Sequence, residues 1–400
     1  FDGGVIRQIG PMSDGPVFIA TTEIIDAAGM HVYPGLISPV TDLGLIEMRQ
    51  TRPSTDLSEN NDPNGEVYAA AAVNPDSWLL PVARAGGVLL AGTWPSGGDI
   101  PGHVSLISMD GWTNDDLTVV RGAGLVVNWP NMRPFRSRFV ATSDDEQMAN
   151  TRRALQRIDE YFAGAAAYRA ARAADPTHPI DLRYEGMLAC LPADPATDAL
   201  SAAGSVQEPV MIRADDLDQI TGGVTWAVGR GLKPIVVGGR DAPLCATLLL
   251  EHDVPVIIGG TLRFPKRADS PYDDAYTLPA RLQALGVRWC LASGDESMNE
   301  RNLGMATGIA CAFGLDPDDG LRAITLGAAE IFGVADRYGS LEVGKSATLI
   351  VTTGTPLEIT SQITMAFIDG RQSDLSNKQT ELDRKYRERY RQMGILQDAP

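Results

Sequence analysis

Residues 29–45 read GMHVYPGLISPVTDLGL. The apolar run inside this stretch predicts a β-strand over residues 32–38, with polar residues following at its carboxyl end. Residues 1–31 before it are short extended pieces broken by glycine and aspartate, without a helical period. Such pieces are typical of a small β-sandwich. The strand at 32–38 therefore marks the beginning of a different kind of fold.

From residue 32 to about residue 335, apolar strand-like runs alternate with helical stretches, which is the pattern of βα units around a parallel sheet. The predicted strands are 32–38, 87–92, 104–109, 122–129, 209–213, 233–238, 254–259 and 287–292. The predicted helices include 144–173, 182–190, 216–229, 241–251, 299–313 and 317–332. Eight strands fit a (β/α)₈ TIM-like barrel, which needs ~250 residues. The competing fold, a doubly wound open sheet, is disfavoured because no Gly-rich dinucleotide fingerprint follows any of these strands.

The two ends of the chain are predicted to fold together. Residues 339–371 return to short strands, so segments 1–31 and 336–373 should form a composite β-sandwich domain around the 32–335 barrel. Residues 374–400 form a charged C-terminal helix and tail. Acidic and basic residues interleave there, which predicts a solvated amphipathic helix packed by Leu382, Tyr386 and Tyr390 rather than a nucleic-acid-binding arm.

Composition limits the classes of partner. The chain of 400 residues has 34 Lys and Arg against 51 Asp and Glu, a net charge of −17 that disfavours binding to nucleic acid or to anionic lipid. No apolar run approaches the ~20 residues of a membrane-spanning helix. The four cysteines, without a CxxC pair, are expected to be buried thiols: Cys190, Cys245, Cys290 and Cys311. The cellular compartment stays open.

Residues 29–45 resemble the first-strand signature of the amidohydrolase superfamily, Val-x-Pro-Gly-Leu-Ile-Asp-x-His-x-His. Three further segments are similar to the same superfamily: 2–10, 323–351 and 367–371. The resemblance covers roughly residues 1–371 and is strongest to imidazolonepropionase-like members. In that group opening strands normally precede the point where this chain begins, so a short N-terminal piece is expected to be absent.

The resemblance implies a metal-dependent hydrolase of C–N bonds, with one or two divalent ions at the carboxyl ends of the barrel strands. Such an ion lowers the pKa of bound water toward ~7 and polarises the scissile carbonyl. Neutral imidazoles and carboxylates would have to hold it there.

Carried over position by position, most of the implied ligands are missing. The two first-strand histidines fall on Val40 and Asp42, the fifth-strand histidine on Arg213 and the sixth-strand histidine on Gly238. An arginine cannot act as a ligand and adds a fixed positive charge. The eighth-strand aspartate is retained as Asp295. The fourth-strand lysine of binuclear members has no clear counterpart.

The histidine count leads to the same expectation without any alignment. The chain has four histidines, His31, His103, His178 and His252, and no two of them have the i, i+2 or i, i+4 spacing of a metal-binding pair. Only His103, which enters the third strand, is a candidate binding residue, and a structural role is favoured even for it. A conventional two-metal centre is not expected, and no metal ligands are predicted.

Several side chains remain as candidates for the barrel mouth: Asp42, Trp94, Asn128, Trp129, Arg213, Arg240 and Asp295. Arg213 could pair with Asp42 or Asp295 in the space of the lost metal. Arg213 and Arg240 could instead bind a carboxylate or phosphate. Asp295 could equally cap the helix that follows it. The polar loop 51–65 and the segment 264–274 are expected to cover the mouth.

Two functions therefore compete. In the preferred one, the protein is a metal-free or metal-poor homologue that binds a small molecule or a partner at the barrel mouth and needs no cofactor. In the alternative, it hydrolyses C–N bonds of amides or cyclic amides with a single divalent ion such as zinc on Asp42 and Asp295, the two candidate catalytic residues. Homo-oligomers are typical of the proteins it resembles, but the sequence shows no interface.

Overall fold

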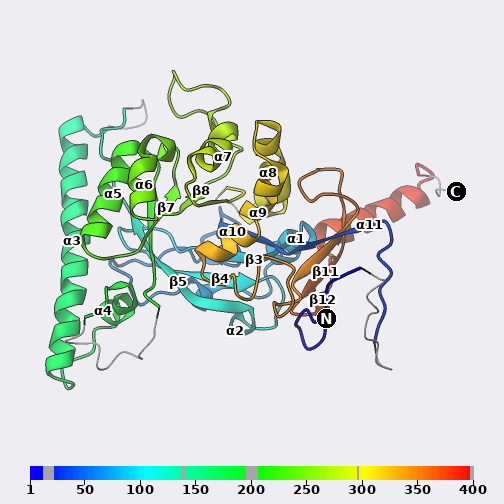
Figure 1. The fold of residues 1–400 in the computed structure, drawn as a ribbon, viewed down its shortest axis with the longest axis horizontal. Coiled ribbons are helices and arrows are strands. Elements are labelled where there is room, and N and C mark those ends of the chain that lie inside the picture. The colour runs from blue at the N-terminus through cyan, green and yellow to red at the C-terminus, as the bar shows by residue number, and fades with distance from the viewer. Residues whose placement is uncertain (12–21, 137–140, 195–205, 295–296, 397–400) are drawn as a thin grey trace.

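An eight-stranded sheet organises the computed structural model, which describes residues 1–11, 22–136, 141–194, 206–294 and 297–396 (Figure 1). Its strands follow one another in chain order: β2 (Leu36–Thr41), β3 (Val88–Thr93), β4 (Gly102–Ser108), β5 (Thr118–Asn128), β6 (Val210–Ala214), β7 (Pro234–Gly238), β8 (Val256–Ile258) and β9 (Trp289–Leu291). The two outer strands, β2 and β9, lie in contact, so the sheet curves nearly into a barrel. All eight predicted strands therefore have a counterpart.

One strand departs from the predicted (β/α)₈ pattern. β4 runs antiparallel to both β3 and β5, whereas every other pair of neighbours is parallel. The reason is the length of the connections. Residues 94–101 and 109–117 are too few for the helical crossover that returns a chain to a parallel strand, which takes a dozen residues or more. The expectation of eight regular βα units is corrected accordingly.

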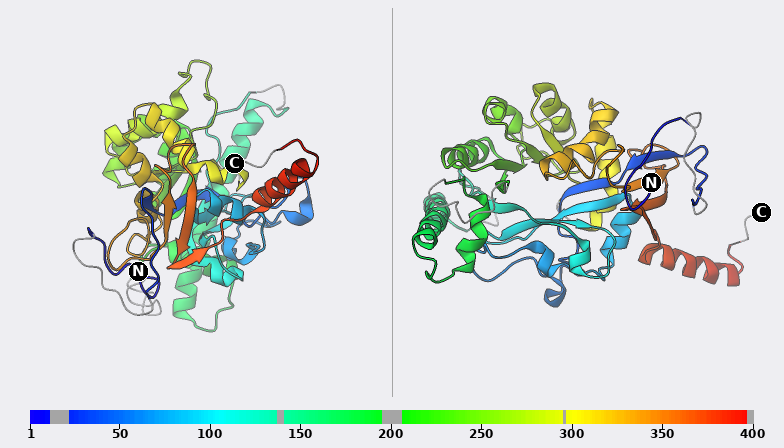
Figure 2. Two further views of the ribbon diagram at one scale, coloured as in Figure 1. Left: turned by 90° about the vertical axis from the view of Figure 1, so that its right-hand side faces the viewer. Right: turned by 60° about the horizontal axis from the view of Figure 1, so that its bottom comes forward.

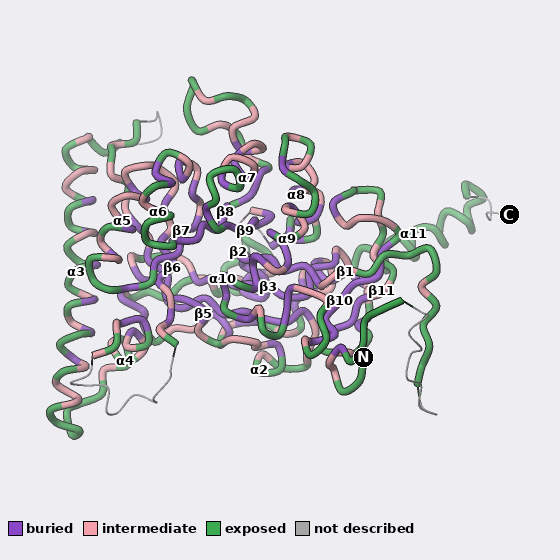
Figure 3. The backbone as a smooth tube through the Cα atoms, viewed as in Figure 1, coloured by how far each residue is buried: buried purple, intermediate pink, exposed green. Residues whose placement is uncertain are grey.

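Helices cover the outside of the sheet (Figure 1). Their bounds are α1 (Leu79–Ala85), α2 (Asn114–Leu117), α3 (Asp144–Ala174), α4 (Leu182–Met187), α5 (Leu217–Gly229), α6 (Ala246–Glu251), α7 (Asp274–Leu285), α8 (Leu303–Ala312), α9 (Pro317–Ala323) and α10 (Leu326–Ile331). Short 3₁₀ turns include η3 (Ala69–Ala72), η4 (Leu188–Cys190) and η7 (Ser297–Asn302). Burial is concentrated on the strands (Figure 3). β2 and β3 are buried at every position, as expected of strands that are covered on both faces.

The predicted strand over 32–38 is split between two sheets. β1 (His31–Pro34) pairs with β10 (Leu349–Thr352), and β2 begins at Leu36. Gly35 lies between them, where an added Cβ would come within 2.7 Å of the Leu89 side chain. Only glycine allows the chain to pass this close to β3.

A second sheet joins β1, which lies at the start of the range predicted for the barrel, to three strands of the C-terminal part of the chain. It has the order β1-β10-β11-β12, with β11 (Ile363–Ile368) and β12 (Arg371–Ser373), and all its pairs are antiparallel. In the described part of residues 1–31, β structure before β1 is limited to isolated bridges, of which Val5 to Ser346 reaches the C-terminal segment. The described residues therefore form one four-stranded sheet, and the expected second layer of a sandwich is not evident in them.

The charged C-terminal helix, α11 (Lys378–Gln392), is present and begins with a capping box at Asn377. It extends away from the body of the chain (Figure 2). Its apolar side chains were expected to pack it, but Leu382, Tyr386 and Tyr390 are 38%, 44% and 42% exposed and none of its residues is buried. That expectation is corrected.

The cysteines carry free thiols, and three of the four are buried. Among the described helices, none combines the length and the apolar character needed to cross a membrane.

Candidate ligand-binding site

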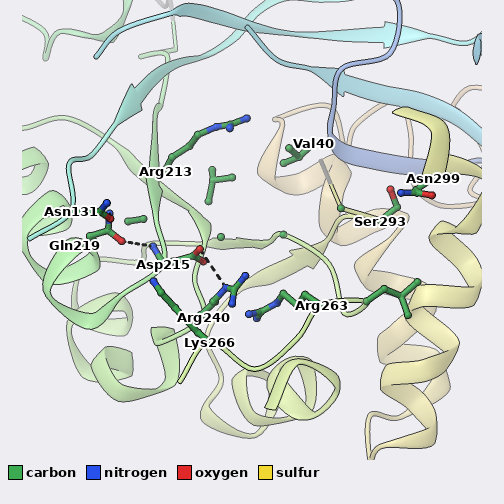
Figure 4. Close-up of a pocket in the computed structure, with 16 residues that line it drawn as sticks. Val40, Asn131, Arg213, Asp215, Gln219, Arg240, Arg263, Lys266, Ser293 and Asn299 are labelled. Carbon is green, nitrogen blue, oxygen red and sulfur yellow. Dashed lines mark hydrogen bonds and ion pairs between the residues drawn. The ribbon is translucent and has the colours of Figure 1, made fainter. Parts of the chain in front are cut away.

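A pocket of about 640 Å³ opens at the carboxyl ends of β6, β7, β8 and β9 (Figure 4). Each strand end contributes to it: Arg213 and Asp215 from β6 and the turn after it, Gly238 and Arg240 from β7 and the turn after it, Gly259 from the turn after β8, and Ser293 from the turn after β9. In barrels and in open parallel sheets this end carries the ligand site, because the loops that follow the strands converge there.

The described lining residues are strongly cationic. Arg213, Arg240, Arg263 and Lys266 line the pocket together with one carboxylate, that of Asp215, whose Oδ2 lies 3.4 Å from Arg240 Nε (Figure 4). Just outside the lining, Asp216 Oδ1 lies 2.5 Å from Lys266 Nζ. In a chain with a net charge of −17, this local excess of positive charge is unusual. Low-dielectric walls around such a cluster focus its field on an incoming anion.

The guanidinium of Arg263 is incompletely hydrogen-bonded. Its Nε donates to the carbonyl of Gly260 at 3.1 Å, but both terminal nitrogens are buried without a hydrogen-bond partner in the described part of the chain. Burial and then the neighbouring Arg240 hold the pKa of Arg263 below its usual value. A buried donor without a partner costs about 1–3 kcal/mol, and more when it is charged. A bound anion near this guanidinium would offset that cost.

Arg213 is held by an aromatic ring. Its guanidinium carbon lies 5.4 Å from the ring centroid of Trp94, within the range of a cation–π contact. Trp94 is only 2% exposed, and its indole N–H donates to the carbonyl of Pro39 at 2.8 Å. Of these two predicted binding residues, Arg213 lines the pocket, whereas Trp94 lies behind it and orients the arginine.

Gly238 stands at the position implied for the sixth-strand histidine ligand, and its backbone conformation favours glycine there. Its φ is +105°, and an added Cβ would come within 2.6 Å of Asp215 Oδ1. A histidine side chain at this position would be strained and would displace Asp215.

Asp42, a predicted catalytic residue, has both carboxylate oxygens engaged within the protein. Oδ1 accepts a hydrogen bond from the Ser297 backbone N–H at 2.7 Å, and Oδ2 lies 2.6 Å from Arg49 Nη2. The side chain thus ties the end of β2 to η7 after β9. Asp295, its expected partner, lies outside the described residues.

A carboxyl group that the sequence did not single out lies just behind the pocket. Glu300 in η7 is fully buried, next to the hydroxyls of Ser38, Thr41 and Ser293. Burial raises its pKa to about 8, although the three hydroxyls act in the opposite direction. Glu300 is therefore mostly protonated at neutral pH. Ser293 also lines the pocket, so its side chain lies between the neutral carboxylic acid of Glu300 and a ligand bound there.

Three predicted mouth residues are found elsewhere. Trp129 is 7% exposed and packs against Trp226 of α5 at 5.4 Å between ring centroids, outside the sheet. Asn128 donates to the carbonyl of Gly98 at 2.8 Å. His103 in β4 is fully buried and faces Glu208. None of the three is among the described residues that line the pocket.

The described donors at the mouth do not fit a divalent metal ion. Val40 and Gly238 have no ligand atom, Arg213 brings positive charge, and the Asp42 carboxylate is already bonded. Within the described ranges, one group of histidine, cysteine and carboxylate side chains has ligand spacing, and it does not involve this pocket.

Comparisons with known proteins find sequence similarity to amidohydrolases. The sequence model of the Amidohydrolase family matches residues 245–373. The imidazolonepropionase of Brucella anthropi is 24% identical over 381 residues, which is 87% of this chain and 84% of the relative. The imidazolonepropionase of Brucella suis is 27% identical over 168 residues, 41% of this chain and 40% of the relative.

Two solved structures give the same fold. An amidohydrolase from Thermotoga maritima superposes with a TM-score of 0.78 at 22% identity, over 94% of each chain. A molinate hydrolase superposes with a TM-score of 0.53 at 14% identity, over 93% of this chain and 89% of that one.

Proposed function

We propose that the chain is an amidohydrolase-superfamily protein that uses its barrel mouth to bind a small anionic molecule through arginine and lysine side chains instead of a divalent metal. The observation that carries the proposal is the excess of cations in the pocket: four cationic side chains against one carboxylate among the described lining residues. Any other acidic group in the pocket would have to come from outside those residues.

The chemistry of the lining favours a carboxylate or a phosphate as the recognised group. The planar guanidinium forms two parallel hydrogen bonds with such an oxyanion, and these charge-assisted bonds are about twice as strong as neutral ones. A volume of about 640 Å³ lies within the usual range for small-molecule sites. The ligand is therefore expected to be a small organic acid or phosphate ester rather than a polymer.

The experiment is a calorimetric titration with inorganic phosphate and with succinate, at low and at high salt. Wild-type protein should bind at least one of them, and Arg240→Gln should weaken that binding by tenfold or more. The matched control is Arg230→Gln, because Arg230 lies outside the pocket on the α5 end and pairs with Asp159. The proposal fails if neither anion binds, or if both variants bind as tightly as wild type.

A second candidate function is hydrolysis of a C–N bond in an amide or cyclic amide. Two observations favour it: the matched relatives are imidazolonepropionases, and Glu300 has a pKa near neutrality beside the pocket. The engaged oxygens of Asp42 argue against one ion shared with Asp295. Turnover of cyclic amides that is lost in Glu300→Gln, with ligand binding unchanged, would favour this candidate over simple binding.

A further inference from the structure

Far from the mouth pocket, three potential metal ligands meet inside the protein. His103 lies in β4, Cys190 ends η4, and Glu208 comes just before β6. One ligand atom from each lies within 4.8 Å of the other two, and all three residues are buried. These groups come from three separate parts of the chain, so their convergence is a property of the fold.

The histidine ring is oriented as a metal ligand would be. Nε2 lies 2.8 Å from the carbonyl oxygen of Gly65, which can only accept, so Nε2 carries a proton. Nδ1 then faces the Glu208 carboxylate, at 2.7 Å from Oε1. Tyr68 stacks on the ring with 4.4 Å between centroids and fixes its plane. A backbone acceptor on the far nitrogen is the usual outer-shell partner of a metal-binding histidine.

The charges of the cluster can be balanced by a divalent ion. Without an ion, Nδ1 and the Glu208 carboxyl group share one hydrogen bond, and the Cys190 thiol lies beside them. Burial, and then the charge of Glu208, holds the pKa of the Cys190 thiol well above its usual value. A divalent ion would neutralise one thiolate and one carboxylate and would leave the imidazole neutral, so the buried site would carry no net charge.

We propose that His103 Nδ1, Cys190 Sγ and the Glu208 carboxylate bind a zinc ion that ties β4, η4 and the start of β6 together. Thiolate and imidazole donors select zinc over magnesium or calcium. With zinc bonds of ~2.1 Å to nitrogen and oxygen, Nδ1 and the carboxylate oxygen would lie about 3.4 Å apart, so the carboxylate moves by less than ~1 Å. A pocket of about 800 Å³ is lined in part by Gly122 and Glu208, so one of the three ligands borders a cavity from which an ion and a fourth, water ligand would enter.

The test uses the full chain, stripped with a chelator and then reloaded with Zn²⁺ or Co²⁺. Wild type should retain one zinc per chain through dialysis, and the cobalt form should show a thiolate-to-cobalt charge-transfer band. Cys190→Ser should lose that band, and both Cys190→Ser and Glu208→Gln should bind zinc at least tenfold more weakly. Cys311→Ser is the control, because Cys311 lies in α8, away from this cluster.

Circular dichroism establishes whether Cys190→Ser is folded. Glu208→Gln removes the charge of a second ligand with a side chain of nearly the same size. The proposal is overturned if wild type retains no zinc, or if zinc binds to Cys190→Ser and Glu208→Gln as tightly as to wild type. The inference does not depend on the mouth pocket: Arg240→Gln should bind zinc as wild type does, so either proposal can fail alone.

Discussion

Replacing Glu300 by glutamine would change how the stability of the protein depends on pH. The glutamine side chain is close in size to a protonated glutamate but cannot ionise. Glu300 is fully buried and its pKa is raised from 4.5 to about 8. Between these two values the folded state holds a proton that the unfolded state has released, so the free energy of unfolding of wild type should fall as the pH rises.

The size of the effect follows from the same pKa values. At about 1.36 kcal/mol per pKa unit, the rise from 4.5 to about 8 corresponds to a loss of about 5 kcal/mol of stability between pH 4.5 and pH 9. Glu300→Gln removes this loss. The variant should have nearly the stability of wild type at pH 4.5 and should be several kcal/mol more stable at pH 9.

Urea denaturation at pH 4.5, 6, 7.5 and 9 measures the difference directly. The control is Glu381→Gln on α11, where the side chain is exposed and the pH dependence should stay that of wild type. If the curves of Glu300→Gln and wild type run parallel over the whole range, Glu300 ionises normally and the reasoning about the buried acid is refuted.

Three further variants test what stabilises the fold around the site and at the C-terminus. Gly238→Ala should destabilise the fold by about 1–3 kcal/mol in urea denaturation, because φ is +105° and the new Cβ would meet Asp215; an unchanged midpoint would contradict this. Asp42→Asn removes the charge that faces Arg49 but keeps an acceptor oxygen, and it should lower the free energy of unfolding by about 1–3 kcal/mol in the same assay. An unchanged free energy of unfolding would mean that other contacts hold β2 and η7 together. A chain truncated after Gln379 should keep its thermal midpoint within about 2 °C, since no residue of α11 is buried and the contacts of Lys378 with Trp78 and of Gln379 with Arg301 are retained; a large drop would show that the rest of the helix packs on the body.

Apolar periodicity located all eight strands of the large sheet, because buried strands are continuous apolar runs whatever their direction. It could not give the direction of β4, which depends on the short connections 94–101 and 109–117. Three described helices escaped prediction: α2, which has four residues, and α1 and α7, which contain Pro81 and Pro279 respectively. Pro81 lies in the first turn of α1, where proline is tolerated, whereas Pro279 lies inside α7, where packing overrides its unfavourable effect.

The candidate site was predictable where its residues follow strands. Arg213 and Arg240 were expected at the mouth because each closely follows an apolar run, and both line the pocket. Lys266 lies in the segment 264–274 that was expected to cover the mouth, but neither it nor Arg263 was singled out, because the loop has no period that marks individual residues. Glu300 stands in a polar stretch, and its burial comes from contacts with β2, more than 250 residues earlier in the chain.

On the function proposed above, the mouth recognises an anion through its cationic side chains. The most direct measurement is anomalous X-ray scattering from crystals soaked in selenate, compared between wild type and Arg240→Gln. We expect a selenium peak within hydrogen-bonding distance of Arg240 and its cationic neighbours in wild type, and a much weaker one in the variant. A transition-metal peak bound by side chains at the mouth, with no selenate beside it, would contradict the claim.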